Sequence, residues 1–261
     1  MGTSCSLFAA GLSTIELLKA EFWVRALAAR LTRFDERSEL ARFNRSAGAW
    51  VPVSAELEAL LHESLRAHEV SGGLVNVAVL PSMLAVGYTR PLSHGPTAAA
   101  LEAVHPAPLL PSVLEVELGR ALLASGVGID LGGIAKGWMA DRLSEQLGAN
   151  VLVNLGGDLR ARGDGPAGAG WPVSLGDATI LLSGHGAATS SVLRRRWGDG
   201  LHHLIDPRTG RPASSGLVEV SVVAAAAVDA EIVAKTALIG GPELAPTFCA
   251  AHADAWRLVP A

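Results

Sequence analysis

The sequence predicts an α+β fold, in which a mixed α/β core carries an inserted smaller lobe. The chain has 261 residues, of which 49% are hydrophobic and 18% are charged, enough for one large folded domain over 1–261. Helical and strand-like segments follow one another without the regular alternation of βαβ units. A stretch rich in proline, serine and histidine, 82–112, interrupts these segments and is the expected variable lobe.

The first third of the chain is predicted to be mainly helical. Apolar residues recur at helical spacing over 15–31, which indicates an amphipathic helix. A shorter helix is expected over 38–44 and should end by Gly48. Ser54 stands where an N-cap belongs, in front of a third helix over 55–67 that carries leucines on one face.

Strand-like segments follow. The run 74–80 is rich in valine and stops at Pro81, and 113–118 alternates as a half-buried strand does. The second half is predicted to contain two strong helices, over 134–147 and 228–239, the first of which is closed by Gly148. Four strands are expected, over 150–154, 171–175, 179–182 and 217–224. The second and third of these strands form a hairpin around Gly176-Asp177.

Charge and cysteine usage exclude several classes of protein. The formal net charge is −4 and there is no basic run, so nucleic acid is not an expected partner. Lysine is rare, with only Lys19, Lys136 and Lys235, so each of the three positions draws attention. Cys5 and Cys249 lie far apart and form neither a disulfide framework nor a C-x-x-C pair.

Apolar runs are short. None approaches the roughly 18 residues of a membrane helix, so no transmembrane segment is expected. The start lacks the basic and apolar regions of a signal peptide. The sequence as given therefore indicates a cytoplasmic protein, or an exported or membrane-attached one if a leader precedes Met1.

A glycine-rich segment, Gly128-Ile-Asp-Leu-Gly-Gly-Ile-Ala-Lys-Gly137, is the richest candidate for ligand binding. Asp130 is followed by two glycines that let the chain turn into a helix, whose free N–H groups can bind an anion beside Lys136. A phosphate or pyrophosphate suits this arrangement. The segment matches neither a Walker loop nor the dinucleotide fingerprint, which has a glycine where Leu131 stands. An ordinary glycine-rich helix start is the alternative.

Two further turns carry polar groups. Asn154-Leu-Gly-Gly-Asp158 can bring the backbone close to a ligand, or it can be a simple turn with positive φ. The loop His203-Leu-Ile-Asp206-Pro-Arg208-Thr-Gly presents an imidazole, a carboxylate and a guanidinium together. A histidine near a carboxylate is the usual makeup of a general base, and arginine can hold phosphate through two hydrogen bonds.

Taken together and in this order, the segments resemble the FAD:protein FMN transferases, the ApbE-like flavin transferase family. The similarity runs nearly end to end, and seven modest motifs in register make it specific. These are Met1-Gly-Thr3, Ser38-Glu-Leu-Ala-Arg-Phe-Asn44, Gly128 to Gly137, Asn154 to Asp158, Ala188-Thr-Ser190, His203 to Gly210, and Glu231 to Pro242.

The resemblance implies an α+β core of the flavin-transferase type that binds FAD and Mg²⁺. It also implies transfer of the FMN phosphoryl group to a Ser or Thr hydroxyl in the flavinylation motif of an acceptor flavoprotein, with release of AMP. The residues that it implies are His203, Asp206 and Arg208 for catalysis; Met1, Phe34, Asn76, Asp130, Lys136, Asn154, Asp158 and His203 for FAD; and Gly133, Glu231 and Asp229 for the metal.

The sequence departs from the family pattern at three places. Asn76 replaces a carboxylate, Ser191 replaces a glycine, and the Asp-x-x-x-Thr metal pair is Glu231-x-x-x-Lys235. Lys235 cannot bind a metal while it is protonated, but one turn away it can neutralise Glu231. Beside the transferase, an FAD pyrophosphatase and a non-catalytic FAD-binding protein therefore stay open, and an NAD-dependent oxidoreductase is the remote alternative.

Overall fold

The computed structural model describes residues 3–46, 48–148, 150–176 and 178–261. They form two compact units: unit 1 comprises 27–133 and 192–214, and unit 2 comprises 3–26, 134–191 and 215–261. Helices and antiparallel sheets build both units, which confirms the predicted α+β class. The expectation of a single domain stays a prediction, and each unit is described by itself.

Unit 2 is built on a six-stranded antiparallel sheet with the strand order β1-β5-β6-β9-β12-β13. Its strands are β1 (Cys5–Ala9), β5 (Val151–Leu155), β6 (Asp158–Arg162), β9 (Gly186–Ser191), β12 (Leu217–Ala224) and β13 (Ala255–Pro260). The predicted strands 150–154 and 217–224 are thus confirmed. Both of them lie inside the sheet, where β5 pairs with β1 and β6, and β12 pairs with β9 and β13.

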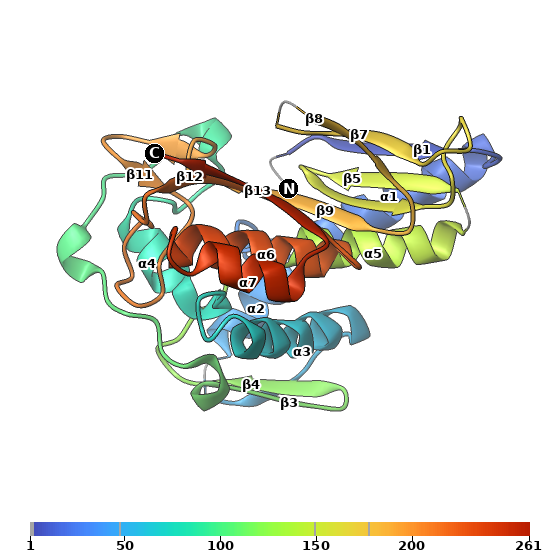
Figure 1. Cartoon of the computed structure of the whole chain (residues 1–261). Coiled ribbons are helices and arrows are strands. Elements are labelled where there is room, and N and C mark those ends of the chain that lie inside the picture. Colours follow the sequence, from blue (N-terminus) through green and yellow to red (C-terminus); the bar gives the residue numbers. More distant parts are fainter. Residues whose placement is uncertain (1–2, 47, 149, 177) are drawn as a thin grey trace. The chain divides into compact units, whose positions relative to one another are not determined.

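Three helices pack together against one face of this sheet: α5 (Ala135–Leu147), α6 (Ala227–Gly240) and α7 (Ala245–His252) (Figure 1). The first two confirm the predicted helices. Gly148 ends α5 with a φ of 91°, a left-handed conformation that favours glycine. Most residues of α6 are buried, so this helix lies inside the unit rather than on its surface.

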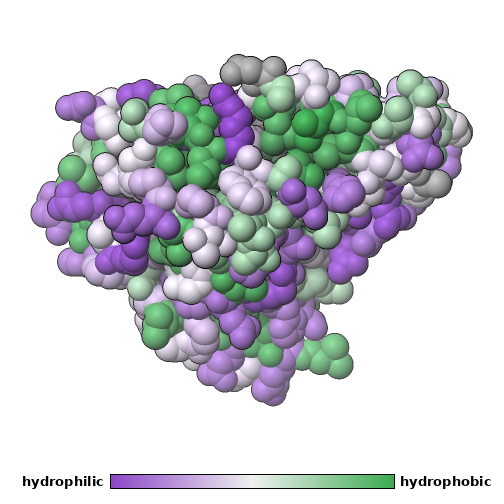
Figure 2. Space-filling model, viewed as in Figure 1, coloured by the Kyte–Doolittle hydropathy of each residue, from purple (hydrophilic) through white to green (hydrophobic). Residues whose placement is uncertain are grey.

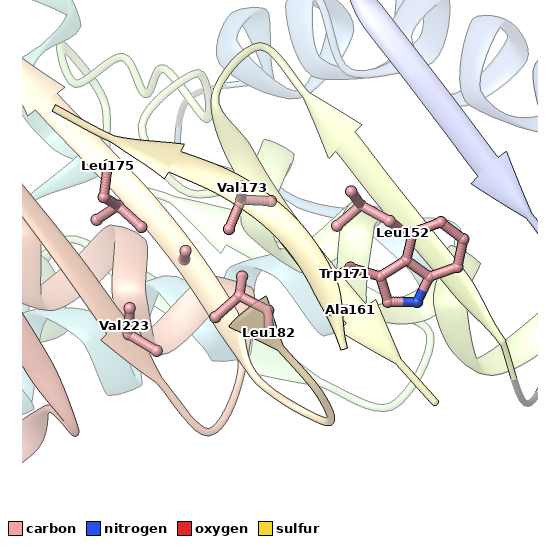
Figure 3. Close-up of a cluster of buried hydrophobic side chains, with 8 residues drawn as sticks. Leu152, Ala161, Trp171, Val173, Leu175, Leu182 and Val223 are labelled. Carbon is pink, nitrogen blue, oxygen red and sulfur yellow. The ribbon is translucent and has the colours of Figure 1, made fainter. Parts of the chain in front are cut away.

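The hairpin of β7 (Trp171–Leu175) and β8 (Ala178–Leu182) also packs on the sheet and confirms the predicted one, although Asp177 at its turn lies outside the described residues. Apolar side chains from the hairpin and from the sheet strands form one cluster (Figure 3): Leu152, Ala161, Trp171, Val173, Leu175, Leu182, Ala187 and Val223. Apolar surface gathers over the hairpin (Figure 2), where Leu181 is exposed.

The first turn of α6 is held by two neighbouring elements. A β-carbon at Gly137 of α5 would lie 2.8 Å from the Ala227 carbonyl oxygen, and one at Gly186 of β9 would collide with the Ala227 nitrogen. The Asp141 carboxylate on α5 accepts hydrogen bonds of 2.9 Å from the N–H groups of Ala227 and Val228. A carboxylate at a helix N-terminus satisfies free donors and interacts favourably with the helix dipole.

Three α-helices of the first third confirm the expected helical start: α1 (Thr14–Arg30), α2 (Glu39–Arg45) and α3 (Ala55–Val70). Ser38 and Ser54 cap the last two by accepting hydrogen bonds from N–H groups in the first turn. In the part of the chain that the structure describes, no helix has the length and apolarity needed to span a bilayer.

Unit 1 also holds two small sheets. The first has the order β2-β4-β3 and comprises β2 (Trp50–Pro52), β4 (Arg120–Leu123) and β3 (Leu114–Glu117), the last of which confirms the strand predicted over 113–118. The second comprises β10 (Arg196–Trp197) and β11 (Leu201–His202).

The predicted strand over 74–80 is wrong. The chain forms a 3₁₀ turn, η1 (Val77–Val79), and then α4 (Leu80–Ala85). Asn76 caps the turn by accepting a 2.9 Å hydrogen bond from the Ala78 N–H group. Pro81 lies in the first turn of α4, where its missing N–H group costs no hydrogen bond. The apolar run is therefore the buried start of a helix.

The stretch 82–112, expected as a variable lobe, contains the end of α4 and three short 3₁₀ turns: η2 (Leu92–His94), η3 (Leu101–Ala103) and η4 (Leu110–Ser112). Met83, Val86 and Tyr88 share a buried cluster with Trp197 and Ile205. The start of the stretch, 83–88, is therefore part of the core of unit 1, whereas every residue of 89–109 is exposed or half-buried.

Candidate functional site

Asp130 of the glycine-rich segment is held by an arginine that the sequence analysis did not single out. Arg33 Nε lies 2.5 Å from Asp130 Oδ2, and the Arg33 side chain is only 4% exposed. The same guanidinium donates a 2.7 Å hydrogen bond to the Tyr88 carbonyl oxygen. It also lies over the rings of Phe34 and Tyr88, at 4.1 and 4.6 Å from their centroids. Charge pairing and ring contacts together fix the Asp130 carboxylate.

The backbone around Asp130 is equally constrained. The Asp130 N–H group donates to the Val77 carbonyl oxygen at 2.9 Å, and Asp130 Oδ1 accepts from the Gly132 N–H group at 2.7 Å. The side-chain amide of Asn44 both accepts from and donates to the backbone of Ile129, each at 2.9 Å. The motif that ends at Asn44 therefore positions the glycine-rich segment.

Three aromatic rings form a row beside this carboxylate. The centroid of Tyr88 lies 5.6 Å from that of Phe34 and 5.5 Å from that of Trp197. Burial raises the pKa of Tyr88, and the Asp130 charge adds to the rise. Phe34 is 37% exposed at the end of the row. Its ring offers a surface on which a planar ligand can pack.

The loop that follows β11 folds around Asp206. The Asp206 carboxylate accepts hydrogen bonds from the Arg208 backbone N–H group at 2.9 Å and from the Arg208 guanidinium at 2.9 and 2.7 Å. The Asp206 carbonyl oxygen accepts from the Gly210 N–H group at 2.8 Å. A β-carbon at Gly210 would collide with the His105 carbonyl oxygen, so this close approach requires glycine.

The two adjacent histidines differ in their surroundings. His202 is buried, its Nε2 lies 3.1 Å from the Ala213 carbonyl oxygen, and its Nδ1 accepts from the Leu204 N–H group at 3.3 Å. Burial lowers the pKa of His202 and favours the neutral ring, in which Nε2 donates to Ala213. His203 is half-buried. His202 therefore holds the backbone, and His203 is the candidate for chemistry.

Unit 2 contains a buried cluster of four charges at the start of α5. The Lys136 ammonium contacts the carboxylate of Asp158, the first residue of β6, and lies 3.0 Å from Glu231 Oε1 on α6. Lys235, one turn after Glu231, places its Nζ 3.6 Å from the same oxygen. The side chains of Lys136, Asp158, Glu231 and Lys235 are 12%, 4%, 4% and 13% exposed. Two positive and two negative charges therefore compensate one another.

Glu231 is the centre of this cluster. Its Oε2 accepts a 3.0 Å hydrogen bond from the Gly137 N–H group in the first turn of α5. Burial by itself would raise the pKa of Glu231, but the charges of Lys136 and Lys235 outweigh burial and hold the pKa below its usual value. The carboxylate is thus ionised at neutral pH and surrounded by donors.

The turn between β5 and β6 brings Asp158 to the cluster. Asn154 Oδ1 accepts a 2.9 Å hydrogen bond from the Gly157 N–H group, which closes the turn. Gly156 has a φ of 72°, and a β-carbon there would collide with Thr3. The Asn-x-Gly-Gly-Asp motif therefore acts as a tight turn that delivers Asp158.

The contacts of Glu231, the first carboxylate expected to bind Mg²⁺, do not fit that ion. Magnesium takes oxygen ligands in octahedral geometry. Oε1 of Glu231 faces the ammonium groups of Lys136 and Lys235, and Oε2 faces a backbone N–H group. Across the described residues, no group of three or more His, Cys, Asp or Glu side chains is arranged to hold a metal ion. Asp229 lies half-buried in the first turn of α6.

The predicted site residues fall into two groups. Unit 1 contains Phe34, Asn76, Asp130, Gly133, His203, Asp206 and Arg208, and unit 2 contains Lys136, Asn154, Asp158, Asp229 and Glu231. Met1, expected beside the flavin, lies outside the described residues. The structure brings Asp206 to Arg208, and Lys136 to Asp158 and Glu231.

The side chain of Asn76 binds backbone groups of two segments. Its side-chain nitrogen donates a 2.8 Å hydrogen bond to the Pro108 carbonyl oxygen, and its oxygen caps η1. The roles that the resemblance implies for Asn76 and for the other site residues stay predictions. Arg33, Tyr88 and Trp197 were missed, and the only signal for Arg33 was its place directly before Phe34.

Comparison with known proteins gives one consistent family. The family model described as the ApbE family matches residues 1–257. A FAD:protein FMN transferase of Salmonella typhimurium is 31% identical over 238 residues, which cover 82% of this chain and 66% of that protein. One of Escherichia coli K12 is 29% identical over 240 residues, which cover 82% and 68%. The chain thus spans about two thirds of the length of these relatives.

Solved structures share the fold. The apo form of the flavinyl transferase ApbE from Pseudomonas stutzeri superposes with a TM-score of 0.85 at 22% identity, covering 100% of this chain and 90% of that one. The ApbE protein of Thermotoga maritima gives a TM-score of 0.84 at 24% identity, covering 99% and 91%.

Proposed function

The chain belongs to the ApbE family, and we propose that it transfers the FMN half of FAD to a Ser or Thr hydroxyl of an acceptor flavoprotein and releases AMP. The observation that carries this proposal is the family match over residues 1–257, which includes every segment of the candidate site. The relatives at 29–31% identity are named FAD:protein FMN transferase.

The reaction makes one bond and breaks one. The acceptor hydroxyl oxygen bonds to the FMN phosphorus, and the bond from that phosphorus to the bridging oxygen of the pyrophosphate breaks. AMP leaves with the bridging oxygen, and the hydroxyl proton passes to a base. Phosphoryl transfer of this kind depends on positioning and on charge stabilisation.

Each candidate residue has a task in this scheme. His203 receives the hydroxyl proton, and the Asp206–Arg208 pair keeps the loop that carries it in one conformation. Phe34 packs against the flavin ring, while Asp130, fixed by Arg33, binds FAD.

The phosphates are assigned to the Gly132-Gly133 turn beside Asp130, where the lack of side chains lets the backbone approach a pyrophosphate closely. FAD is thus the substrate, and the acceptor carries a Ser/Thr flavinylation motif. Magnesium is left out of the proposal because the contacts of Glu231 are with ammonium and N–H groups.

The test is to incubate the purified protein with FAD and a peptide that carries a flavinylation motif, with Mg²⁺ or with EDTA, and to identify products by mass spectrometry. A peptide heavier by the FMN adduct, with equimolar AMP, is expected. FMN and AMP without an adduct would instead indicate an FAD pyrophosphatase. Intact FAD that stays bound under both conditions would indicate a binding protein.

The role of His203 has its own control. His203→Ala should slow adduct formation by about 10²–10⁴-fold at saturating FAD, because the base that receives the hydroxyl proton is removed. His62→Ala changes an exposed histidine on α3 and should leave the rate unchanged. Equal rates for His203→Ala and wild type would remove His203 from the mechanism.

A further inference from the structure

Glu231 and Lys235 stand one turn apart on α6, inside the compensated cluster of four charges. In the family pattern that the sequence resembles, these two positions carry an Asp and a Thr as a metal pair. Here the second position carries an ammonium group whose Nζ lies 3.6 Å from Glu231 Oε1. The same feature that makes this chain unusual in sequence therefore places a fixed positive charge against the carboxylate.

A buried carboxylate needs a counter-charge, which either a metal ion or a side chain can supply. With Lys136 and Lys235 on one side and Asp158 and Glu231 on the other, the net charge of the cluster is already zero. A divalent cation at Glu231 would raise this sum to +2 in a poorly hydrated place. It would also have to displace two ammonium groups, which are repelled by it.

The contacts of Glu231 are complete in another sense. Oε1 faces two ammonium groups at 3.0 and 3.6 Å, and Oε2 accepts from the Gly137 N–H group at 3.0 Å. All of these partners are donors, so the carboxylate is oriented by hydrogen bonding and charge. A metal is not required to orient it.

We propose that the ammonium group of Lys235 takes the place of a divalent cation at Glu231, so that this protein binds FAD and transfers FMN without Mg²⁺. The statement on transfer rests on the proposed function, whereas the statement on metal and FAD binding is separate. The substitution at one position thus exchanges a bound ion for a covalently attached charge.

The decisive variant is Lys235→Thr, which restores the hydroxyl of the family pattern and leaves the cluster with a net charge of −1. FAD affinity and the rate of adduct formation of the wild type should be the same in EDTA and in millimolar Mg²⁺. In EDTA, the FAD affinity and the rate of adduct formation of Lys235→Thr should each fall at least about tenfold, a difference of about 1.4 kcal/mol. Addition of Mg²⁺ should restore both quantities. Lys19→Thr, on the exposed side of α1, is the matched control and should behave as wild type.

A further measurement needs no variant. The wild type is titrated with Mn²⁺, and the free ion is followed by electron paramagnetic resonance. We expect no bound Mn²⁺ that millimolar Mg²⁺ displaces. Two results would overturn the proposal. One is a tenfold loss of wild-type FAD affinity in EDTA that Mg²⁺ reverses. The other is a stoichiometric Mn²⁺ site in the wild type, where Lys235 is still present. If no adduct forms under any condition, the proposed function fails, and the affinities for FAD and Mn²⁺ still decide the role of Lys235.

Discussion

Replacing Lys136 by methionine removes the ammonium group that contacts two buried carboxylates, those of Asp158 and Glu231. Methionine keeps most of the apolar stem, so the change acts on charge more than on packing. Lys235 remains 3.6 Å from Glu231, and the uncompensated charge therefore falls on Asp158. Asp158 has a side chain that is only 4% exposed, so water cannot take over the role of the lysine.

Removing one partner of a buried ion pair costs about 3–5 kcal/mol. The free energy of unfolding of Lys136→Met should fall by that amount at pH 7, a large part of the 5–15 kcal/mol typical of a domain. The double variant Lys136→Met/Asp158→Asn has a neutral cluster again, with Glu231 paired to Lys235. It should recover at least about half of the lost free energy of unfolding, because the free-energy changes caused by substitutions at contacting residues are not additive.

Guanidinium unfolding followed by circular dichroism measures both variants, with an unchanged m-value as the sign that only stability has moved. A Lys136→Met stability within about 1 kcal/mol of wild type would refute the reasoning. So would a further loss on adding Asp158→Asn.

Three other predictions follow from burial and close contact. Gly137→Ala should lower the free energy of unfolding by about 1–3 kcal/mol, because its β-carbon would lie 2.8 Å from the Ala227 oxygen; a higher melting temperature would contradict this. Burial lowers the pKa of His68 and of His202, so the unfolded chain binds protons first below about pH 6.5 and stability should fall from pH 7 to pH 5. His68→Gln should show a shallower fall in a series of unfolding curves, and equal slopes would argue against the assignment. Burial raises the pKa of Cys249 to about 11, so a thiol reagent at pH 9 should modify one cysteine in the native protein and two after unfolding.

The helices were predictable because their ends are signalled locally. Ser38 and Ser54 cap the helices that they precede, and Gly148 ends α5 in a left-handed conformation. The error over 74–80 arose because a short apolar run fits a strand or a buried helix equally well. Asn76 and Pro81 were the signals that favour a helix start, since asparagine is typical of an N-cap and proline of the first turn.

Contacts between distant segments could not be predicted in the same way. Lys136, Asp158 and Glu231 belong to three separate motifs, and only the sheet and helix packing of unit 2 closes the cluster. The neighbourhood of Glu231 and Lys235 was predictable, because residues four apart lie on one side of a helix. Arg33 carried no signal beyond its place directly before Phe34, since its partner Asp130 lies 97 residues further along the chain.

The start of α6 has a consequence for the order in which unit 2 assembles. Ala226, the residue before this helix, has no side-chain group that can cap it, and the cap comes from Asp141, which lies 86 residues before Ala227. Contacts of such long sequence separation form late, after the entropy of closing a long loop has been lost. Until the α5 segment is in place, the N–H groups of Ala227 and Val228 lack the acceptor that Asp141 supplies in the folded unit. The helix that carries Glu231 and Lys235 is therefore completed by the tertiary structure rather than by its own sequence.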